Sequence, residues 1–404
     1  MQHILKKLTQ AVILSTSLSL VAGASIAATP ATEVSIKPIP NLPADFIKGA
    51  DISILPDVEQ HGGKFYNRQG VEQDPLLILK NNGINYVRIR LWNDPQDAKG
   101  NPYGGGNNDL KTDLALAKRA HALGLKLLLD FHYSDFWTDP GKQFKPKAWK
   151  DLDYQQLTAR LGQYTQQTVA AFVKAGVSPD MIQIGNEINS GILWPTGKSW
   201  GQDGHEFDRL ANMLKVAIKG AKASDPNALI MLHLAKGADQ NMYKWWFGEI
   251  TKRDVPFDII GVSFYPYWDG KIPALLANLK QIAAQYNKDV IVAETQYGYS
   301  TTDCDKTPNS FGEKEAKESG YPGTVQGQAD FLHDLITAVN QVPQHRGKGI
   351  FYWEPLWLPV KGSTWATPAG MDYINDHWQQ GNSRENQDLF DCHGKVLPSI
   401  QVFN

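Results

Sequence analysis

Short runs of Ile, Val and Leu recur along the chain and alternate with amphipathic segments. Each run is nearly continuous in hydrophobicity, which is typical of a parallel strand covered on both faces. Eight runs of this kind begin near Phe46, Tyr86, Leu125, Met181, Leu229, Ile259, Val290 and Gly349. Apolar residues at helical spacing predict helices over residues 110–125, 154–175 and 207–223. Repeated strand-then-helix units predict an α/β fold, a (β/α)8 TIM barrel with long insertions.

The alternative arrangement is a doubly wound open sheet, which usually shows an early glycine-rich phosphate loop. Residues 104–106 are consecutive glycines, but they follow no strand directly and lack the Lys-Ser or Lys-Thr pair of a phosphate loop. They therefore predict a turn.

Long loops follow the third, fourth, seventh and eighth predicted strands, over residues 133–150, 190–204, 296–325 and 357–389. Loops of this length in a compact domain are usually functional. Their tryptophans are Trp137, Trp149, Trp194, Trp200, Trp357, Trp365 and Trp378. Because a Trp ring can stack on the apolar face of a sugar, these loops predict an extended carbohydrate groove at the barrel mouth.

Two glutamates stand where predicted strands end, Glu187 after the fourth run and Glu294 after the seventh. The carboxyl ends of barrel strands converge on one face, where active sites lie. Glycoside hydrolysis needs two such carboxyls, one a neutral acid and the other ionised as a nucleophile or as a base for water. Burial and mutual repulsion would separate their pKa values. The alternative for each is an ion pair at the barrel end, which is the role we expect for Glu354 on the last strand.

The N-terminus has the features of a secretory signal peptide. Lys6 and Lys7 precede an apolar stretch over residues 11–24, and Ser25 and Ala27 place small residues at a cleavage site. The stretch is too short for a membrane-spanning helix of about 20 residues, although an uncleaved anchor is the alternative. We expect a signal peptide over residues 1–27, a linker over 28–45 and one catalytic barrel domain over 46–404. The protein would then be secreted or periplasmic.

Charge and composition exclude several partner classes. The chain of 404 residues has 40 Lys and Arg against 42 Asp and Glu, and its net charge is −2. Proteins that bind nucleic acid normally show a basic excess, so we expect no nucleic-acid partner. After signal cleavage no remaining apolar run reaches membrane length, so we expect no membrane association. We also expect a monomer. Twelve tryptophans are more than a core of this size needs.

The chain has two cysteines, Cys304 and Cys392. In an oxidising compartment an even count predicts one disulfide. It would close a loop of 88 residues, worth about 4 kcal/mol on the loop-entropy model. The alternative is two unrelated buried thiols, and two cysteines cannot form a four-cysteine zinc site.

Around these residues the chain resembles glycoside hydrolases of clan A, and more closely the endo-β-1,4-galactanases of glycoside hydrolase family 53. The resemblance covers residue 46 to the C-terminus. The matching motifs are residues 49–53 (GADIS), 87–92 (VRIRLW), 130–141 (DFHYSDFWTDPG), 184–189 (IGNEIN), 293–295 (AET) and 352–355 (YWEP). The third motif is highly specific, whereas the whole clan shares the Asn-Glu pair.

The resemblance implies a role for each matching residue. Glu187 would be the proton donor and Glu294 the nucleophile, in a retaining mechanism on a (β/α)8 barrel. Arg90 would hydrogen-bond the nucleophile, Tyr265 would contact it, Asn186 would bind the sugar 2-hydroxyl, and Trp353 would form the floor of the cleavage subsite. The remaining candidates for substrate binding are Asp51, Trp92, His132, Asp135, Trp137, Asp139 and His233. The two histidines are expected to hydrogen-bond sugar or carboxylate, or else to be structural, and not to bind zinc.

The seventh loop carries a candidate calcium site, although no cofactor is expected for catalysis. Asp303, Asp305 and Asn309 place oxygen side chains at alternate positions, which suits Ca²⁺. Bacterial members of the family are similar here and bind calcium. This sequence departs from them at Cys304 and Thr307, so the disulfide could replace the metal, and a solvated polar loop is the remaining alternative.

The expected function is that of a secreted retaining endo-glycosidase that hydrolyses β-1,4-galactosidic bonds in pectic galactan, or type I arabinogalactan. One alternative is a clan A enzyme acting on another β-glycan, such as mannan or glucan. The other is a non-catalytic sugar-binding barrel, against which the presence of both glutamates argues.

Overall fold

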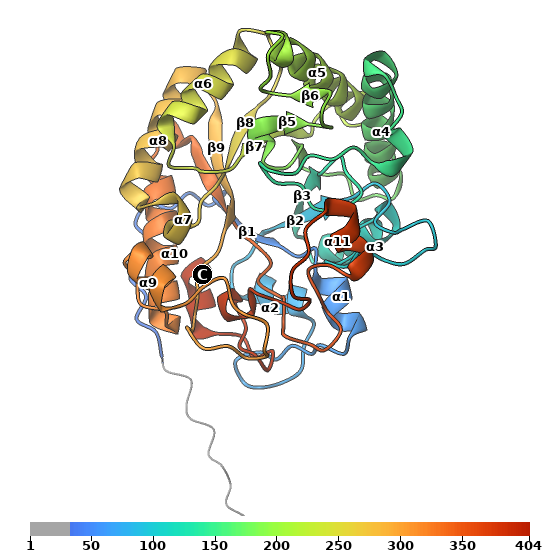
Figure 1. Ribbon diagram of the computed structural model, residues 1–404. Coiled ribbons are helices and arrows are strands. Elements are labelled where there is room, and N and C mark those ends of the chain that lie inside the picture. Colours follow the sequence, from blue (N-terminus) through green and yellow to red (C-terminus); the bar gives the residue numbers. More distant parts are fainter. Residues whose placement is uncertain (1–32) are drawn as a thin grey trace, which may run out of the picture. The chain divides into compact units, whose positions relative to one another are not determined.

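Eight parallel strands close into a barrel in the computed structural model, which describes residues 33–404 (Figure 1). The strand order around the barrel is β1-β10-β9-β8-β7-β4-β3-β2. The strands are β1 (Ile47–Asp51), β2 (Tyr86–Leu91), β3 (Lys126–Phe131), β4 (Met181–Ile184), β7 (Leu229–Leu234), β8 (Ile259–Ser263), β9 (Asp289–Thr295) and β10 (Gly347–Tyr352). All eight predicted runs form barrel strands, so the TIM-barrel prediction is confirmed and the open sheet is excluded.

Helices follow the strands, and the longer ones form the outer ring (Figure 1). They are α1 (Leu55–Gln60), α2 (Pro75–Asn81), α3 (Leu110–Ala122), α4 (Tyr154–Lys174), α5 (Glu206–Ser224), α6 (Gln240–Thr251), α7 (Pro266–Asp269), α8 (Ile272–Tyr286), α9 (Glu313–Ser319), α10 (Val325–Asn340) and α11 (Pro368–Ile374). The three helices predicted from periodicity are α3, α4 and α5. Asp109 and Asp153 cap the first two by accepting backbone N–H bonds, which places their starts close to the predicted ones.

The interior of the barrel is apolar in its lower layer, away from the active-site mouth, and polar towards the carboxyl ends of the strands. The lower layer includes Tyr86, Leu128, Met231 and Phe351. Gly49 makes room for this layer, since a Cβ there would lie 2.2 Å from the Phe351 ring. Inward positions nearer the carboxyl ends of the strands carry charged and amide side chains instead. The strands thus hold a polar cluster rigidly at the mouth of the barrel.

Long segments at the mouth interrupt the alternation of strand and helix. The predicted long loops after β3, β4, β9 and β10 are present, and the β4 loop contains a small hairpin, β5 (Gly191–Ile192) with β6 (Gly197–Lys198). The connection from β2 to α3 over residues 92–109 is also long and was not predicted from the sequence. Short 3-10 helices lie at Lys147–Trp149, Ile188–Ser190, Pro343–His345, Glu385–Gln387 and Pro398–Phe403.

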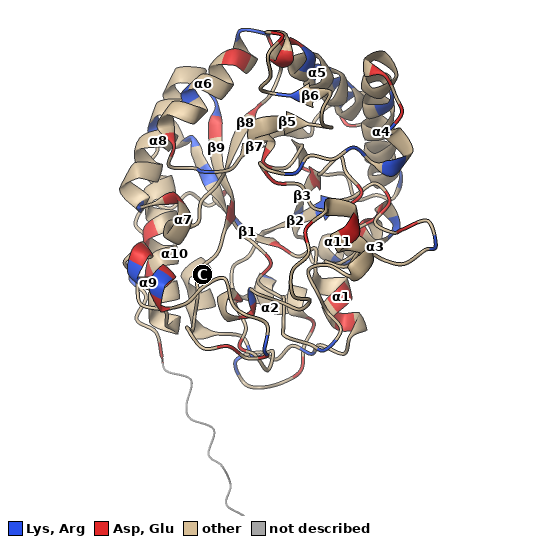
Figure 2. Cartoon of the chain, in the orientation of Figure 1, with Lys and Arg blue, Asp and Glu red and all other residues tan. Residues whose placement is uncertain are grey.

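The predicted signal peptide lies outside the described residues. Residues 33–45 form no helix or strand, and Ile36, Ile39 and Leu42 pack against the core. Within residues 33–404, no helix combines the length and apolar character that crossing a membrane requires. Basic and acidic residues are interspersed along the outer helices (Figure 2).

Candidate active site

Glu187 lies in a tight left-handed turn just after β4. Its φ is +48° and that of Gly185 is +87°. A Cβ at Gly185 would lie 2.5 Å from the Ile188 side chain, so only glycine fits there. Left-handed backbone at a non-glycine residue is costly and concentrates at functional sites. The turn directs the Glu187 carboxyl into the cleft, where Oε1 accepts a 2.6 Å hydrogen bond from Ser263 Oγ.

Glu294 lies on β9 and is held from two sides. Arg88 donates to its Oε1 at 2.8 Å, and the Tyr265 hydroxyl donates to its Oε2 at 3.1 Å. The pairing of β8 with β9 shifts register between Val262 and Ser263, so that Ser263 stands opposite Glu294. Such irregularities often re-aim side chains beside active sites.

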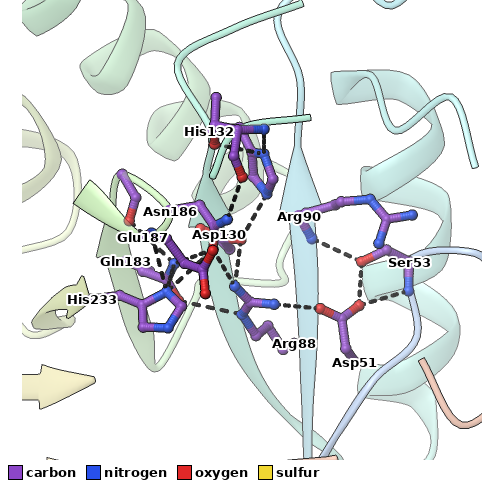
Figure 3. Close-up of polar contacts among 12 residues, drawn as sticks. Asp51, Ser53, Arg88, Arg90, Asp130, His132, Gln183, Asn186, Glu187 and His233 are labelled. Atoms are coloured by element: carbon purple, nitrogen blue, oxygen red, sulfur yellow. Dashed lines mark hydrogen bonds and ion pairs between the residues drawn. The ribbon is translucent and has the colours of Figure 1, made fainter. Parts of the chain in front are cut away.

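Arg88 on β2 is the centre of the polar cluster (Figure 3). It is 1% exposed and bonds Asp51 and Asp130 at 2.7 Å each, and Asn186 Oδ1 at 2.9 Å. Burial by itself lowers the pKa of Arg88, but the surrounding carboxylates raise it above its ordinary value. The guanidinium therefore stays charged and supplies a fixed positive charge beside Glu294.

The two glutamates differ in their electrostatic surroundings. Burial raises the pKa of Glu187 well above its ordinary value, and the neighbouring Glu294 raises it further. Burial also raises the pKa of Glu294, but there Arg88 opposes the effect. Glu187 is thus the better proton carrier and Glu294 the more readily ionised group, which is the division of roles that two-carboxyl hydrolysis requires.

His132 is a neutral, internally bonded histidine. Its Nδ1 accepts the Thr138 backbone N–H at 3.1 Å, so the ring proton lies on Nε2, which is 3.2 Å from Asp130 Oδ2. Burial lowers the pKa of His132, although Asp130 opposes this. The histidine therefore orients a carboxylate of the cluster.

A cleft of about 590 Å³ opens over the glutamates. Its aromatic lining consists of Trp137, Tyr265, Trp268, Trp353, Trp357, Trp365 and Trp378. Of the loop tryptophans predicted to form a groove, Trp149 is instead buried, and Trp194 and Trp200 lie outside the cleft. The flat apolar rings suit the C–H faces of sugars.

The model of glycosyl hydrolase family 53 matches residues 47–403. The chain belongs to glycosyl hydrolase family 53. It is 38% identical to an endo-beta-1,4-galactanase of Bacillus subtilis (strain 168) over 92% of this chain and 89% of that protein. It is 33% identical to an arabinogalactan endo-beta-1,4-galactanase of Thermothelomyces thermophilus, over 88% of this chain and 98% of the relative.

Solved structures of family 53 share the fold. The Ignisphaera aggregans catalytic domain superposes with a TM-score of 0.86 at 42% identity, covering 92% of this chain and 99% of that one. A fungal β-1,4-galactanase structure gives 0.71 at 33% identity, covering 88% and 98%. The family 53 protein described here is accordingly a glycoside hydrolase.

The structure brings together most of the residues that sequence and resemblance singled out. Those that line the cleft are Arg90, His132, Trp137, Asp139, Asn186, Glu187, Tyr265, Glu294 and Trp353. Asn186 Nδ2 donates one hydrogen to the Thr138 carbonyl at 2.8 Å, which leaves its second amide hydrogen for a ligand.

The role expected for Arg90 as partner of the nucleophile is wrong. Its guanidinium pairs with Glu354, bonds the Gly105 carbonyl and lies 4.1 Å from the centre of the Trp137 ring. Arg88 contacts Glu294 instead. The ion pair expected for Glu354 is confirmed. Burial raises the pKa of Glu354, and the Arg90 charge and the Ile54 backbone N–H oppose this rise.

Four other residues predicted to bind substrate lie behind the cleft surface, where a sugar cannot reach them. Asp51 is fully buried and bonds Arg88 and Ser53. Trp92 packs among Phe136, Trp137 and His132. Asp135 pairs with Lys147 at 2.8 Å, and His233 bonds Gln183 and Ser263. The polarity of Asp51, Asp135 and His233 reflects internal pairing, because buried polar groups need partners.

The predicted disulfide joins Cys304 to Cys392, with Cα atoms 6.1 Å apart. Asp303 and Asp305 lie beside it, and Glu385 completes a group whose carboxylate oxygens lie within 4.8 Å of one another. Among residues 33–404, Glu385 Oε2 and Asn309 Oδ1 are buried with no hydrogen-bond partner. An all-oxygen set with two unpartnered atoms fits a calcium ion.

Sequence reasoning missed Arg88, Asp130 and Ser263 as parts of the site. Arg88 and Asp130 lie within the quoted motifs, yet nothing local distinguishes Arg88 from Arg90 on the same face of one strand. Ser263 is an ordinary serine in an apolar run, and only the strand register shows what it touches.

Proposed function

We propose that this protein is a retaining endo-β-1,4-galactanase that cleaves pectic galactan, or type I arabinogalactan, by a double displacement. The observation that carries the proposal is the pair formed by Glu187 and Glu294, held at two strand ends under a Trp-lined cleft. Their surroundings favour a proton on one and a charge on the other. The galactanase names of the relatives support the substrate class.

In the first step, Glu187 gives its proton to the glycosidic oxygen while a carboxylate oxygen of Glu294 attacks the anomeric carbon. The bond to the leaving sugar breaks and a glycosyl ester forms on Glu294. Arg88 and Tyr265 hold the nucleophile in place. Asn186 would donate to the 2-hydroxyl, and Trp353 would lie under the sugar ring.

In the second step, ionised Glu187 takes a proton from water, and the resulting hydroxide displaces Glu294 from the sugar. Two inversions restore the original configuration, so the first-formed product is the β-anomer. Retention requires the two carboxyls to lie about 5–5.5 Å apart. NMR of the early product tests this step, and an α-anomer would indicate direct displacement by water.

The substrate is tested by measuring reducing ends released from potato galactan, mannan and carboxymethylcellulose. Rapid release from galactan alone supports the proposal. Release mainly from mannan or carboxymethylcellulose would identify a different β-glycan as substrate. No release from any of them would favour a sugar-binding barrel.

Further parts of the proposal concern the mature protein. We propose that residues 1–27 are removed on export, that the protein works in the periplasm or medium, and that it is a monomer. We also propose that Asp303, Asp305 and Asn309 hold a structural calcium ion, with Glu385 as a further ligand. Such an ion would stabilise the loop and take no part in the chemistry.

A further inference from the structure

Ser263, the last residue of β8, connects Glu187 to a buried histidine. The serine is 1% exposed. Its Oγ lies 2.8 Å from His233 Nε2 and 2.6 Å from Glu187 Oε1. His233 is itself fully buried and does not line the cleft. The three side chains come from three different strands or their ends, and they form one chain of contacts directed into the active site.

The other nitrogen of His233 fixes the direction of every hydrogen in this chain. Nδ1 lies 3.0 Å from Gln183 Nε2 and 3.2 Å from Asn186 Oδ1, and it accepts the Glu187 backbone N–H at 3.4 Å. The backbone N–H of Glu187 can only donate, and Asn186 Oδ1 already accepts from Arg88 at 2.9 Å. Nδ1 is therefore the unprotonated nitrogen, and the ring proton lies on Nε2. Burial also lowers the pKa of His233 well below its ordinary value, which keeps the ring neutral.

The proton on His233 Nε2 is donated to Ser263 Oγ. The serine hydroxyl has only one hydrogen, and it therefore points to Glu187 Oε1. An oxygen that accepts this bond is a poor place for the carboxyl proton, so the acidic proton of Glu187 lies on the other oxygen, Oε2.

We propose that His233 and Ser263 are positioning residues that keep the acidic proton of Glu187 on Oε2. The inference rests on the proposed role of Glu187 as the acid. General acid catalysis depends on the proton lying within hydrogen-bond reach of the atom that receives it. Without the serine, the proton can occupy either oxygen and the carboxyl can rotate.

The register of the barrel builds this arrangement. The shift between β8 and β9 places Ser263 opposite Glu294. The Gly237 N–H holds the Ser263 carbonyl at 2.8 Å. His233 also contacts Glu187 at its backbone nitrogen, so the chain constrains the acid at both its main chain and its carboxyl.

The serine also affects the protonation equilibrium of the acid. The Ser263 hydrogen bond favours the ionised form of Glu187, against burial and against Glu294, Asp139 and Asp269, which raise its pKa. The basic side chains that line the same cleft are Arg88, Arg90, Lys142, Lys236 and Arg384. With this set unchanged, loss of the serine hydroxyl should raise the pKa of Glu187.

The test compares Ser263→Ala with Ser399→Ala on two substrates. Ser399 is an equally buried serine that donates to Gln328, outside the cleft, so it controls for loss of a buried hydrogen bond. The substrates are galactan, whose leaving sugar needs a proton, and a nitrophenyl β-galactobioside, whose leaving group does not. The parameter is kcat/KM, because it reports the glycosylation step.

For Ser263→Ala we expect kcat/KM on galactan to fall roughly 10- to 100-fold and kcat/KM on the nitrophenyl substrate to change less than about threefold. The basic limb of the pH profile should move to higher pH. Ser399→Ala should leave kcat/KM on both substrates and the pH profile unchanged. Equal losses on both substrates, or no loss on galactan, would overturn the inference.

Glu187→Ala measured in parallel separates this inference from the proposed function. If Glu187→Ala itself lost activity equally on both substrates, its role as the acid would be wrong and the inference would fall with it. If Glu187→Ala spared the nitrophenyl substrate and Ser263→Ala did not, only the positioning role would be overturned.

Discussion

At the scale of single residues, the two arginines of β2 show how position decides role. Arg88 and Arg90 both lie on the inward face of the strand and both are 1% exposed. Arg88 bonds Glu294, the proposed nucleophile, whereas Arg90 bonds Glu354, and both partners lie far from β2 in the sequence. Lysine has fewer donors and cannot reproduce the planar fork of either.

We therefore expect Arg88→Lys to lower kcat/KM on galactan by roughly 100-fold or more, as losing a donor to a reacting group does elsewhere. Arg90→Lys should cost about as much stability, because a buried pair is disturbed in both, yet keep activity within about tenfold. Thermal melting and kinetics at a temperature where both variants are folded check this. A larger activity loss in Arg90→Lys would contradict the structure.

Glu294→Gln tests the nucleophile. The amide keeps the shape of the side chain but cannot form the glycosyl ester, so turnover should fall at least about 10⁴-fold. Burial raises the pKa of Glu294, and although Arg88 opposes this, Asp130 and Asp51 add to it, so the net shift is upward. An uncharged side chain at this position should therefore not destabilise the fold, and the melting temperature at neutral pH should stay the same or rise. Near-normal activity would remove Glu294 from its role.

At the scale of elements, the loop after β9 and the C-terminal segment are joined by the Cys304–Cys392 disulfide. The hydroxyl oxygen of Tyr299, in the same loop, lies 3.2 Å from Cys392 Sγ. Residues after β10 also supply Trp365, Trp378 and Arg384 to the cleft. The disulfide thus supports one wall of the cleft and not the glutamates themselves.

Reduction of the disulfide should lower stability by up to about 4 kcal/mol, since it releases a loop of 88 residues in the unfolded chain. Activity on long galactan should fall more than activity on short oligomers, because distant subsites lose their shape. Melting with and without reductant measures the first effect, and the paired Cys304→Ser and Cys392→Ser variant is the control. Two free thiols in the denatured, unreduced protein would refute the bond.

Glu385 makes the same region sensitive to pH. Burial raises its pKa to about 7, against hydrogen bonds from Asn309 and the Cys304 N–H. The protonated carboxyl of Glu385 is favoured in the folded protein, because its pKa there exceeds the unfolded value of 4.5. Its contribution to stability is therefore fully present below pH 4.5. The stability is lost as pH rises through 7.

With chelator present, the wild type should therefore lose on the order of a few kcal/mol more than Glu385→Gln between pH 5 and 8. Calcium would favour the ionised carboxylate, so an excess of the ion should raise the melting temperature of the wild type at pH 8. Melting curves at several pH values, with chelator or calcium, check both effects. Identical curves in the two conditions would remove the proposed ion.

At the scale of the whole molecule, the barrel of residues 33–404 contains all the groups on which the proposed chemistry depends. The N-terminal segment before it is expected to serve export alone. If so, protein recovered from the periplasm or medium should begin at Ala28, and intact mass with N-terminal sequencing checks this. Recovery of chains that keep residues 1–27 in a membrane fraction would instead indicate an anchor.

The sequence by itself determined the eight barrel strands, three of the longer helices and the placement of the two glutamates. Strand and helix periodicity are local properties, so each barrel strand could be predicted from its own apolar run. Because the carboxyl ends of parallel strands meet at one face, Glu187 and Glu294 could be predicted to lie together. The disulfide was predictable because the chain has two cysteines and no others.

Only the tertiary structure decided which polar residues reach the cleft and which pair inside. Arg88 meets Glu294 across 206 positions of sequence, and Ser263 meets Glu187 across 76 positions, beside a one-residue shift in the pairing of β8 with β9. The aromatic Trp92 and the acidic Asp135 both follow barrel strands, as residues of the cleft do, yet both are buried. Such contacts depend on strand register and on packing around the closed barrel, and a local pattern contains neither.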